Sequence, residues 1–173
     1  MANKIIICGY ARHGKDTVAE YLRDKHGISF ESSSYMAMDI FLYDSLKPLF
    51  GYKTKEECYN DRVNKRELWH DLIKQYNSQD KSRLAKDIIA KNDCYVGMRS
   101  KEEFDECVKQ GIFTHYIWVD AFERKEPEDV TSCTLRREHF LETKGAILLT
   151  NNLSLKELHN KLDVLAMKIK LMS

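Results

Sequence analysis

Short apolar runs alternate along the chain with longer stretches in which apolar residues recur at helical spacing. The runs are rich in β-branched and aromatic side chains, and they comprise Lys4–Cys8, Ile28–Ser32, Cys94–Met98, Tyr116–Val119 and Ala146–Leu149. Strands separated by helices are typical of βαβ units. The pattern therefore predicts an α/β fold with a parallel five-stranded sheet flanked by helices.

The stretches between the runs have the amphipathic spacing of helices. The first helix is expected to bury Val18, Ala19 and Leu22 on one face. Further helices are expected at Tyr35–Leu46, which would end before Pro48, at Asp61–Tyr76 and at Ser82–Lys91.

Three more helix starts carry the capping-box pattern, in which a hydroxyl and a glutamate three residues later satisfy free amides of the first turn. The pairs are Thr54 with Glu57, Ser100 with Glu103, and Ser154 with Glu157. The last pair would open a long helix with an apolar stripe that is spaced for packing against the sheet. The stripe comprises Leu155, Leu158, Leu162, Leu165 and Ile169.

Composition narrows the class of protein. The 173 residues fit a single domain, or one domain with a small lid, and 43% hydrophobic residues suffice for a core. Because 28 basic and 27 acidic side chains leave a net charge of +1, a surface that binds nucleic acid or membranes mainly through charge is disfavoured. Five scattered cysteines form no CxxC pair, which predicts free thiols. The apolar run at 5–8 is far shorter than a membrane span of about 20 residues, so we expect a cytoplasmic protein without a membrane partner.

The strongest chemical signal follows the first predicted strand and reads Gly9-Tyr10-Ala11-Arg12-His13-Gly14-Lys15-Asp16-Thr17. A glycine-rich loop between a strand and a helix turns its amides and the helix N-terminus toward phosphate oxygens, while the lysine reaches the β and γ phosphates. The sequence thus predicts ATP as cofactor, bound by Gly9, Arg12, His13, Gly14, Lys15, Asp16 and Thr17, with Lys15 catalytic.

The residue after the lysine departs from the usual pattern. Asp16 stands where serine or threonine is common, and the hydroxyl is displaced to Thr17. We expect Thr17 to contact phosphate or Mg²⁺ and Asp16 to help orient the metal. The sequence contains no Asn-Lys-x-Asp guanine signature, which disfavours a GTPase switch.

The loop and the two residues after it resemble P-loop kinases of nucleotides and related small molecules, in particular phage-type deoxynucleoside monophosphate kinases. The segment from Leu148 to Leu158 is similar to theirs and to that of dephospho-coenzyme A kinase, where the loop after the last strand lies beside the adenine. The resemblance implies that Val18, Asn151 and Asn152 also bind the cofactor. It further implies a three-layer P-loop fold with strand order 2-3-1-4-5, and a single domain over 1–173 with an acceptor-binding helical region at about 35–92 and a lid at about 121–140.

The third predicted strand diverges from that resemblance. The phage kinases tend to carry Asp-x-Arg followed by Asn-Glu there, whereas this chain matches at Arg99 and Glu103 but has Gly97 in the aspartate position. The run Val96-Gly97-Met98-Arg99-Ser100 looks more like phage kinases of thymine hypermodification, which phosphorylate the hydroxymethyl group of 5-hydroxymethyldeoxyuridine in DNA. The resemblance thus implies either modified DNA or a free deoxynucleotide as acceptor.

Candidate acceptor residues follow from where the strands would end, because open α/β sheets bind ligands at their carboxyl edge. Ser33 and Ser34 lie at the end of the second strand, and Asp39, one helical turn later, would accept the proton of an alcohol acceptor. The other candidates supply cations, a carboxylate or an aromatic ring, and they are Arg62, Arg66, Trp69, Arg99, Glu103 and Arg136. A solvated helix face is the alternative interpretation of Arg62 and Arg66.

The segment after the fourth strand is where nucleotide kinases place their lid. Asp120 is a candidate for orienting the acceptor or, through water, Mg²⁺, and Arg124 is expected to bind the cofactor and act on the transferring phosphate. Asp39, Asp120 and Arg124 thus join Lys15 as predicted catalytic residues.

The sequence as a whole predicts a kinase that uses ATP and Mg²⁺, with 5-hydroxymethyluracil in phage DNA as the preferred acceptor. A free deoxynucleoside monophosphate is the alternative acceptor, and a non-catalytic nucleotide-binding regulatory protein is the alternative of another class. The near-neutral charge disfavours DNA and Gly97 disfavours the monophosphate, so the acceptor stays open, as does the oligomeric state.

Overall fold

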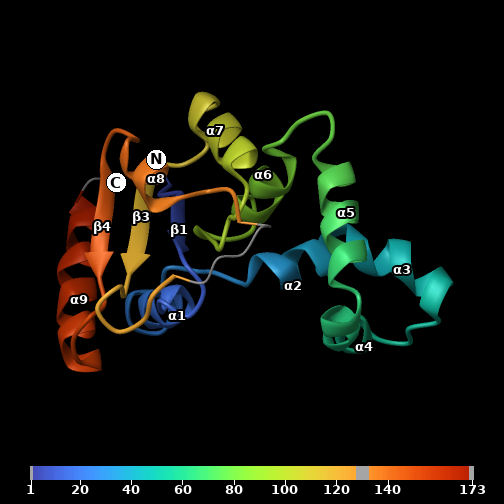
Figure 1. Cartoon of the computed structure of the whole chain (residues 1–173), viewed down its shortest axis with the longest axis horizontal. Helices are drawn as coiled ribbons and strands as arrows, with labels where there is room; N and C mark the ends of the chain where they lie inside the picture. The colour runs from blue at the N-terminus through green and yellow to red at the C-terminus, as the bar shows by residue number, and fades with distance from the viewer. Residues whose placement is uncertain (1, 128–132, 172–173) are drawn as a thin grey trace.

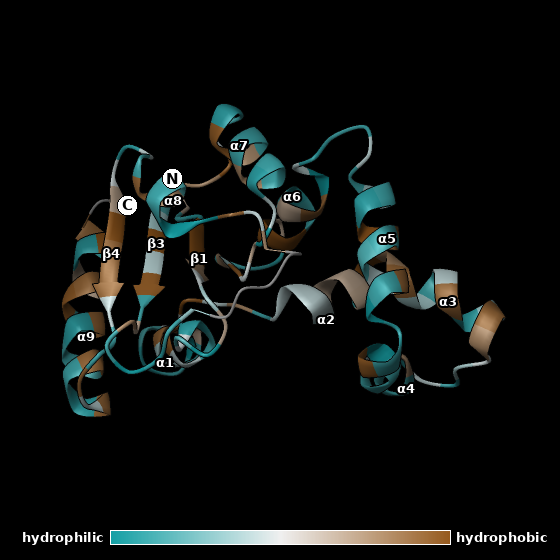
Figure 2. Cartoon of the chain, in the orientation of Figure 1, coloured by the Kyte–Doolittle hydropathy of each residue, from teal (hydrophilic) through white to brown (hydrophobic). Residues whose placement is uncertain are grey.

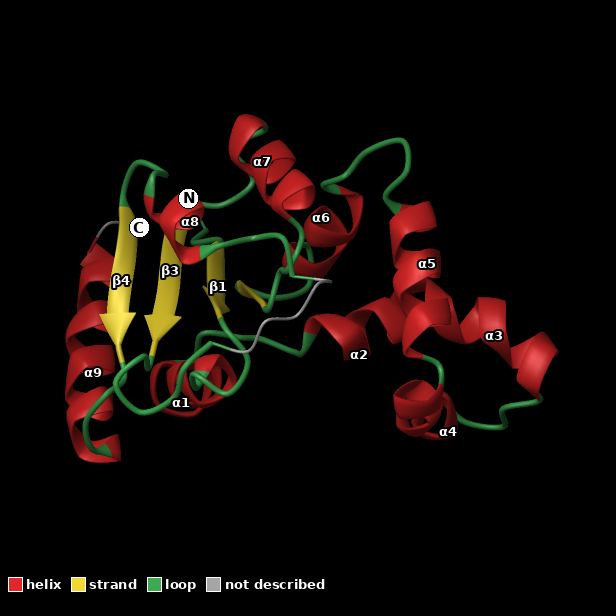
Figure 3. Ribbon diagram, viewed as in Figure 1, coloured by secondary structure: helices red, strands yellow, loops and turns green. Residues whose placement is uncertain are grey.

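The centre of the molecule is a parallel sheet. In the computed structural model, which describes residues 2–127 and 133–171, four strands form one sheet in the order β2-β1-β3-β4. The strands are β1 (Ile5–Gly9), β2 (Cys94–Val96), β3 (His115–Asp120) and β4 (Ala146–Thr150). Neighbouring strands pair in parallel, so their carboxyl ends meet at one edge, and Figure 3 shows β3 and β4 running in the same direction.

The prediction of a fifth strand at Ile28–Ser32 is wrong for the sheet. Phe30 makes an isolated parallel bridge to Cys94, outside the four strands. The segment then turns into a helix, because the Ser32 hydroxyl accepts a hydrogen bond from the Tyr35 amide at 3.1 Å and caps α2. The bridge lies beyond β2, so the four strands keep the places 3-1-4-5 of the expected order.

Helices cover both faces of the sheet, which confirms the three layers (Figure 1). Alternate residues of β1 point to opposite faces: Ile5 and Ile7 pack with α1 (Lys15–His26) and α9 (Leu155–Leu171). Ile6 and Cys8 pack on the other face with α6 (Arg83–Ile89), α7 (Lys101–Lys109) and α8 (Arg137–Leu141).

A helical arm, residues 33–76, extends to one side of the sheet (Figure 1). It comprises α2 (Ser33–Ala37), the π-helical η1 (Met38–Leu42), α3 (Tyr43–Phe50), α4 (Lys55–Asn60), the 3₁₀ turn η2 (Asp61–Asn64) and α5 (Arg66–Tyr76). Met36, Leu46 and Trp69 of the arm belong to the same apolar cluster as Ile6 of the sheet. The arm is therefore packed onto the core by a continuous hydrophobic interior.

Two expected helix boundaries in the arm are wrong. The helix expected to end before Pro48 runs on to Phe50, with Pro48 inside α3. Proline lacks the N–H that would reach the carbonyl of Asp44, and because Asp44 is exposed, water can hydrate that carbonyl.

The helix expected over Asp61–Tyr76 is interrupted at Lys65, whose φ of −134° is not helical. The Asp61 carboxylate accepts hydrogen bonds from the side-chain amide of Asn64 at 2.9 Å and from the Lys65 ammonium. These side-chain bonds compete with continuation of the helix and close η2 as a separate turn.

The three capping boxes are confirmed as helix starts. The amides of Glu57, Glu103 and Glu157 donate to the hydroxyls three residues earlier at 3.2, 3.3 and 3.2 Å. In α9 the expected stripe is buried at Leu158, Leu162, Leu165 and Ile169, whereas Leu155 is 57% exposed. Figure 2 shows the resulting alternation of apolar and polar bands along this helix.

Two further expectations concern the whole chain. The cysteines Cys8, Cys58, Cys94, Cys107 and Cys133 are all free, as predicted. Among the helices of the described residues, none combines the length and the hydrophobicity needed to span a bilayer.

Candidate phosphate-binding site

The loop predicted to bind phosphate, called the phosphate loop below, connects β1 to α1 across residues 10–14. Gly14 is the N-cap of α1 and has a φ of +94°, in the left-handed region that favours glycine, and Arg12 has a φ of +63°. Because Gly14 has no side chain to cap the helix, the first amides of α1 point outward without an intrahelical acceptor. This strand–loop–helix geometry can hold an anion at the carboxyl edge of the sheet.

Lys15, Asp16 and Thr17 form the first turn of α1. Lys15 is partly exposed, and Asp16 and Thr17 are exposed. Mg²⁺ prefers oxygen ligands and usually takes only one or two from the protein, with phosphates and water supplying the rest. The carboxylate and hydroxyl therefore fit Mg²⁺, and the described part of the chain contains no cluster of three or more His, Cys, Asp or Glu that could hold a metal by itself.

The His13 side chain is fully buried in the protein. Its Nδ1 accepts a hydrogen bond from the amide of Ala121 at 3.1 Å, and its Nε2 lies 2.8 Å from the carbonyl of Lys125. An acceptor at Nδ1 together with a donor at Nε2 requires the neutral Nε2–H tautomer. The imidazole is thus committed to the turn at residues 121–125 and does not supply an anion contact.

Arg124, Asn151 and Asn152, all predicted to bind the cofactor, come together beside the loop. The Arg124 Nε donates to the Asn151 carbonyl at 2.6 Å, and the Asn151 Nδ2 donates to the His13 carbonyl at 3.0 Å. The Asn152 Oδ1 accepts from the amide of Glu123 at 3.1 Å. A turn after β3 and a loop after β4 are therefore tied to the phosphate loop.

Asp120 ends β3 at the same edge and is buried. Its Oδ1 accepts from the Phe122 amide at 2.8 Å, and its Oδ2 accepts from the Arg137 guanidinium at 2.6 Å. This hydrogen bond raises the pKa of Arg137 above its usual value. Arg137 also lies over the Phe122 ring, 4.4 Å from its centroid. These two contacts hold the guanidinium in place, and its hydrogen bond orients Asp120.

Lys15, Gly97 and Ser33, of which Ser33 is a predicted acceptor residue, come together at the same edge of the sheet. Gly97 has a φ of +90°, and a Cβ placed on it would lie 3.5 Å from Lys15 Cε and 3.9 Å from Ser33 Oγ. The absence of a side chain at Gly97 thus leaves a small space between the lysine stem and the serine hydroxyl. Ser34 occupies the same turn of α2.

Behind Ser33 lies a group of polar side chains with little exposure to water. The hydroxyl of the buried Tyr95 interacts with Ser33, and burial holds the pKa of Tyr95 well above its usual value. The charge of Glu103 also raises the pKa of Tyr95, and the Glu103 Oε1 accepts a hydrogen bond from the side-chain amide of Asn77 at 3.2 Å. Burial also raises the pKa of Glu103. Sequence reasoning missed Asn77, because nothing local distinguishes it from an ordinary helix-ending asparagine.

Asp39 is engaged elsewhere. It lies in η1, where its Oδ1 accepts from the Lys55 ammonium at 2.5 Å and its Oδ2 lies 3.9 Å from the Lys91 ammonium. The hydrogen bond to Asp39 raises the pKa of Lys55. As a base Asp39 would first have to give up a lysine partner.

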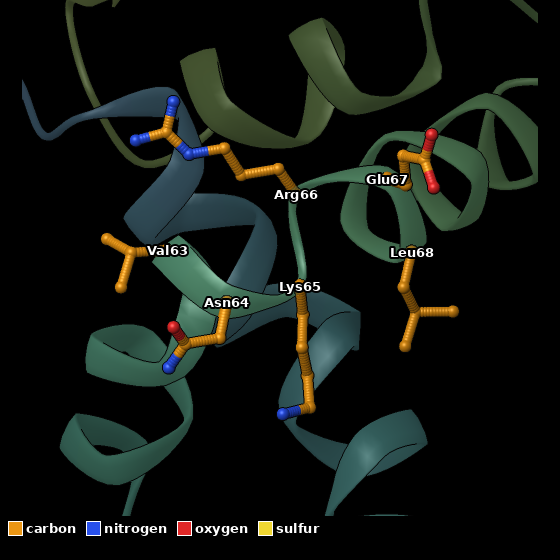
Figure 4. A pocket seen from close by; sticks show the side chains of 6 residues that line it. All are labelled: Val63, Asn64, Lys65, Arg66, Glu67 and Leu68. Carbon is orange, nitrogen blue, oxygen red and sulfur yellow. The ribbon is translucent and has the colours of Figure 1, made fainter.

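The arm residues predicted to bind the acceptor do not form one clamp. Trp69 is only 4% exposed, so burial removes its ring from the surface on which a base would stack. Arg62 lies over the Tyr59 ring, 4.5 Å from its centroid. Arg66 lines a shallow groove of about 430 Å³ with Val63, Asn64, Lys65, Glu67 and Leu68 (Figure 4). In Figure 4 the Arg66 and Lys65 side chains point away from each other, so the groove does not gather their charges at one place.

The segment expected to be a lid reaches both sides of the site in its described parts. Residues 121–125 contact the phosphate loop, whereas the amides of Thr134 and Leu135 each donate to the Arg99 carbonyl at 2.9 Å. The Arg99 side chain is exposed, as is that of Arg136 just before α8. Residues 128–132 of the expected lid lie outside the described residues.

Two of the predicted cofactor-binding residues, Val18 and Gly9, pack against other parts of the protein. The Val18 side chain is fully buried in the core beneath α1. Gly9 ends β1 so close to β3 that a Cβ there would lie 2.6 Å from the Val119 carbonyl oxygen.

No protein-family model and no curated protein matches this sequence. Among solved structures, a gluconokinase from Sinorhizobium meliloti 1021 is similar over 99% of this chain and 98% of its own, at 13% sequence identity and a TM-score of 0.46. A likeness this distant assigns neither a family nor a substrate.

Proposed function

We propose that this chain is a phosphotransferase that moves the γ-phosphoryl group of ATP to a nucleotide-type acceptor. The observation that carries the proposal is the loop between β1 and α1, with Gly14 in the left-handed conformation and Lys15 opening the helix. Residues predicted to bind the cofactor, Arg124, Asn151 and Asn152, gather around the same loop. Convergence of these groups at one sheet edge favours a nucleotide site over a chance glycine-rich turn.

In the proposed reaction the bond from the γ-phosphorus to the bridging oxygen breaks and a bond to the acceptor oxygen forms. Lys15 and the open amides of α1 stabilise the charge on the β and γ phosphates, and Arg124 supplies a second cation. Mg²⁺, held by the oxygens of Asp16 and Thr17, would neutralise phosphate charge. Residues 121–140 act as the lid and residues of about 35–92 bind the acceptor.

The acceptor side favours a neutral hydroxyl group. The space over Gly97 adjoins the Ser33 hydroxyl, Ser33 interacts with Tyr95, and the charge of Glu103 acts on Tyr95. A hydroxyl group in this small space can hydrogen-bond with Ser33, and its reaction benefits from a carboxylate that draws its proton. We therefore prefer the 5-hydroxymethyl group of 5-hydroxymethyluracil in phage DNA as acceptor.

A free deoxynucleoside monophosphate is the second candidate acceptor. Two observations favour it: the net charge of +1 is unlike that of a protein that neutralises many DNA phosphates, and Arg66 and Arg99 are exposed on the acceptor-side segments. A regulatory protein that binds nucleotides without catalysis would bind ATP but transfer nothing.

The proposal is tested by offering labelled ATP together with free deoxynucleoside monophosphates, 5-hydroxymethyl-dUMP and DNA that contains 5-hydroxymethyluracil. Label in the modified DNA alone supports the preferred acceptor, and label in the free nucleotides alone supports the second. ATP binding without transfer to any acceptor contradicts the phosphotransferase proposal.

A further inference from the structure

The turn at residues 121–125 has no regular secondary structure, yet it carries Arg124. The amides of Arg124 and Lys125 both donate to the Ala121 carbonyl, at 3.0 and 2.9 Å, which closes a tight turn. The His13 ring hydrogen-bonds to a backbone group at each end of this turn, the Ala121 amide and the Lys125 carbonyl. One side chain of the phosphate loop therefore holds the turn at both ends.

The environment of His13 fixes the orientation of the ring. The Tyr10 and Phe122 rings form T-shaped contacts with it at centroid distances of 5.8 and 5.7 Å, and the His13 side chain is fully buried. Rotating the ring by half a turn about the Cβ–Cγ bond would exchange each nitrogen for a carbon, so that C–H groups would face the Ala121 amide and the Lys125 carbonyl and both hydrogen bonds would be lost. A ring held in this way is a precise spacer between two backbone segments.

The contact network forms a closed circuit through Arg124. The His13 ring holds the turn, Arg124 of the turn donates to the Asn151 carbonyl at 2.6 Å, and the Asn151 side chain returns to the His13 carbonyl at 3.0 Å. Asn151 also lies against Gly14, since a Cβ on Gly14 would lie 2.5 Å from its Nδ2. The position of Arg124 relative to the loop is thus determined by His13 at one end and Asn151 at the other.

We propose that His13 is a positioning residue, whose neutral imidazole clasps the 121–125 turn to the phosphate loop and thereby places Arg124 against the bound nucleotide. The inference rests on the proposed function, because Arg124 has a ligand only if a nucleotide occupies the loop. His13 itself makes no contact with that nucleotide. Its effect passes through the turn.

The clasp is tested first without any nucleotide, by amide hydrogen exchange. In His13→Phe, which keeps a ring but no nitrogen, the Ala121 amide is expected to exchange about tenfold faster, as follows from losing one hydrogen bond in a buried site. Tyr10→Phe is the matched control. Tyr10 lies in the same loop as His13, and the substitution removes only a hydroxyl that accepts a hydrogen bond from the Arg137 amide at 3.1 Å, outside the 121–125 turn. Unchanged exchange at Ala121 in His13→Phe would overturn the clasp.

The positioning role is tested by ATP binding in a double-mutant cycle. His13→Phe is expected to weaken ATP binding about tenfold, and to add nothing when Arg124→Ala is already present, because both changes remove the same interaction. The effect of Tyr10→Phe should instead add to that of Arg124→Ala. Additive effects of His13→Phe and Arg124→Ala, or unchanged ATP affinity in His13→Phe, would overturn the role.

His13→Asn tests the same contacts should His13→Phe fold poorly. The Oδ1 of His13→Asn lies close to where Nδ1 was and can still accept from the Ala121 amide, so partial retention of both exchange protection and ATP affinity is expected. If His13→Asn lost as much exchange protection and ATP affinity as His13→Phe, the result would contradict a hydrogen-bonded clasp. If the wild type itself binds no ATP, the proposed function and the positioning role both fail, whereas the exchange result still reports on the clasp.

Discussion

Lys15 stands at the start of α1 with its side chain partly exposed, and it takes no part in the hydrophobic core. Lys15→Ala is therefore expected to abolish phosphoryl transfer while changing stability by less than about 0.5 kcal/mol, as is usual for a substitution outside the core. The lost charge would otherwise stabilise the β and γ phosphates. Transfer of label from ATP and the thermal melting curve check both parts, and substantial turnover in a normally folded variant would contradict the phosphate-loop assignment.

Gly97 offers a test of the acceptor space. Gly97→Ala is expected to cost about 1–2 kcal/mol of stability because of the left-handed backbone. The new methyl group would also lie 3.5 Å from Lys15 Cε and 3.9 Å from Ser33 Oγ. Since it fills the space where the acceptor hydroxyl is proposed to sit, the KM for the acceptor should rise more than the KM for ATP.

Gly145 is the matched control for that substitution. Its φ is +82°, and a Cβ there would meet nothing within 4 Å. Gly145→Ala should thus lose a similar amount of stability and leave both KM values unchanged. Equal changes of the acceptor KM in the two variants would show that backbone strain, rather than filled space, is responsible.

Single residues were the hardest features to predict from the sequence. The phosphate loop could be recognised because its glycines and lysine act at fixed spacing along one segment. The burial of Trp69, the pairing of Asp39 with Lys55 and the burial of the His13 ring against residues 121–125 depend on groups that are distant in sequence. A tryptophan, an aspartate or a histidine looks the same in the sequence whether it serves a ligand or a neighbour.

At the scale of elements, helix starts were predictable and helix interruptions were not. A capping box is complete within four residues, as at Ser100 and Glu103, so its signal is local. The helix is interrupted at Lys65 because hydrogen bonds to the Asp61 carboxylate compete with those of a continuing helix. The Ile28–Ser32 segment does not continue as a strand because Ser32 caps α2. In both cases the pattern of apolar residues gave no sign of the change, because hydrogen bonds of polar side chains determine the backbone conformation there.

The contact between α1 and α9 carries a pH-dependent prediction. Asp163 of α9 accepts hydrogen bonds from Tyr21, Lys25 and His26 of α1, at 2.9, 2.9 and 2.8 Å. The Lys25 bond is the leading cause that lowers the pKa of Asp163 to about 2. A carboxyl whose pKa is lowered by folding stabilises the protein above its unfolded pKa of about 3.9, and this contribution is lost as the pH falls toward the folded value.

Asp163→Asn should therefore lower Tm at neutral pH, and the difference from wild type should shrink as the pH falls from about 5 toward 2. Thermal melts of both proteins across this range provide the measurement. Asp24, exposed on α1 and paired with its neighbour Arg23, provides a control, because Asp24→Asn removes a carboxylate that does not join the two helices. A difference in Tm that stays constant with pH would contradict the ion-pair origin of the effect.

At the scale of the whole molecule, the arm and the sheet share one hydrophobic interior. Trp69 of the arm and Trp118 of β3 belong to the same buried cluster, and they are 4% and 2% exposed. Because the interior is continuous, we expect the chain to unfold as one cooperative unit, as the expected single domain over 1–173 requires. The sequence contains two tryptophans, so each region has its own fluorescent reporter.

Trp118→Phe leaves Trp69 to report on the arm, and Trp69→Phe leaves Trp118 to report on the sheet. In each variant the fluorescence transition in urea is expected to coincide with the far-UV circular dichroism transition of the same protein, because loss of either region exposes apolar surface of the other. Comparing two probes within one variant removes any effect of the substitution on overall stability. An arm signal that changes at lower urea than the circular dichroism would mean that residues 33–76 unfold first. Most of the proposed acceptor-binding region would then be a separate unit, able to open while the phosphate loop and the turn at residues 121–125 stay folded.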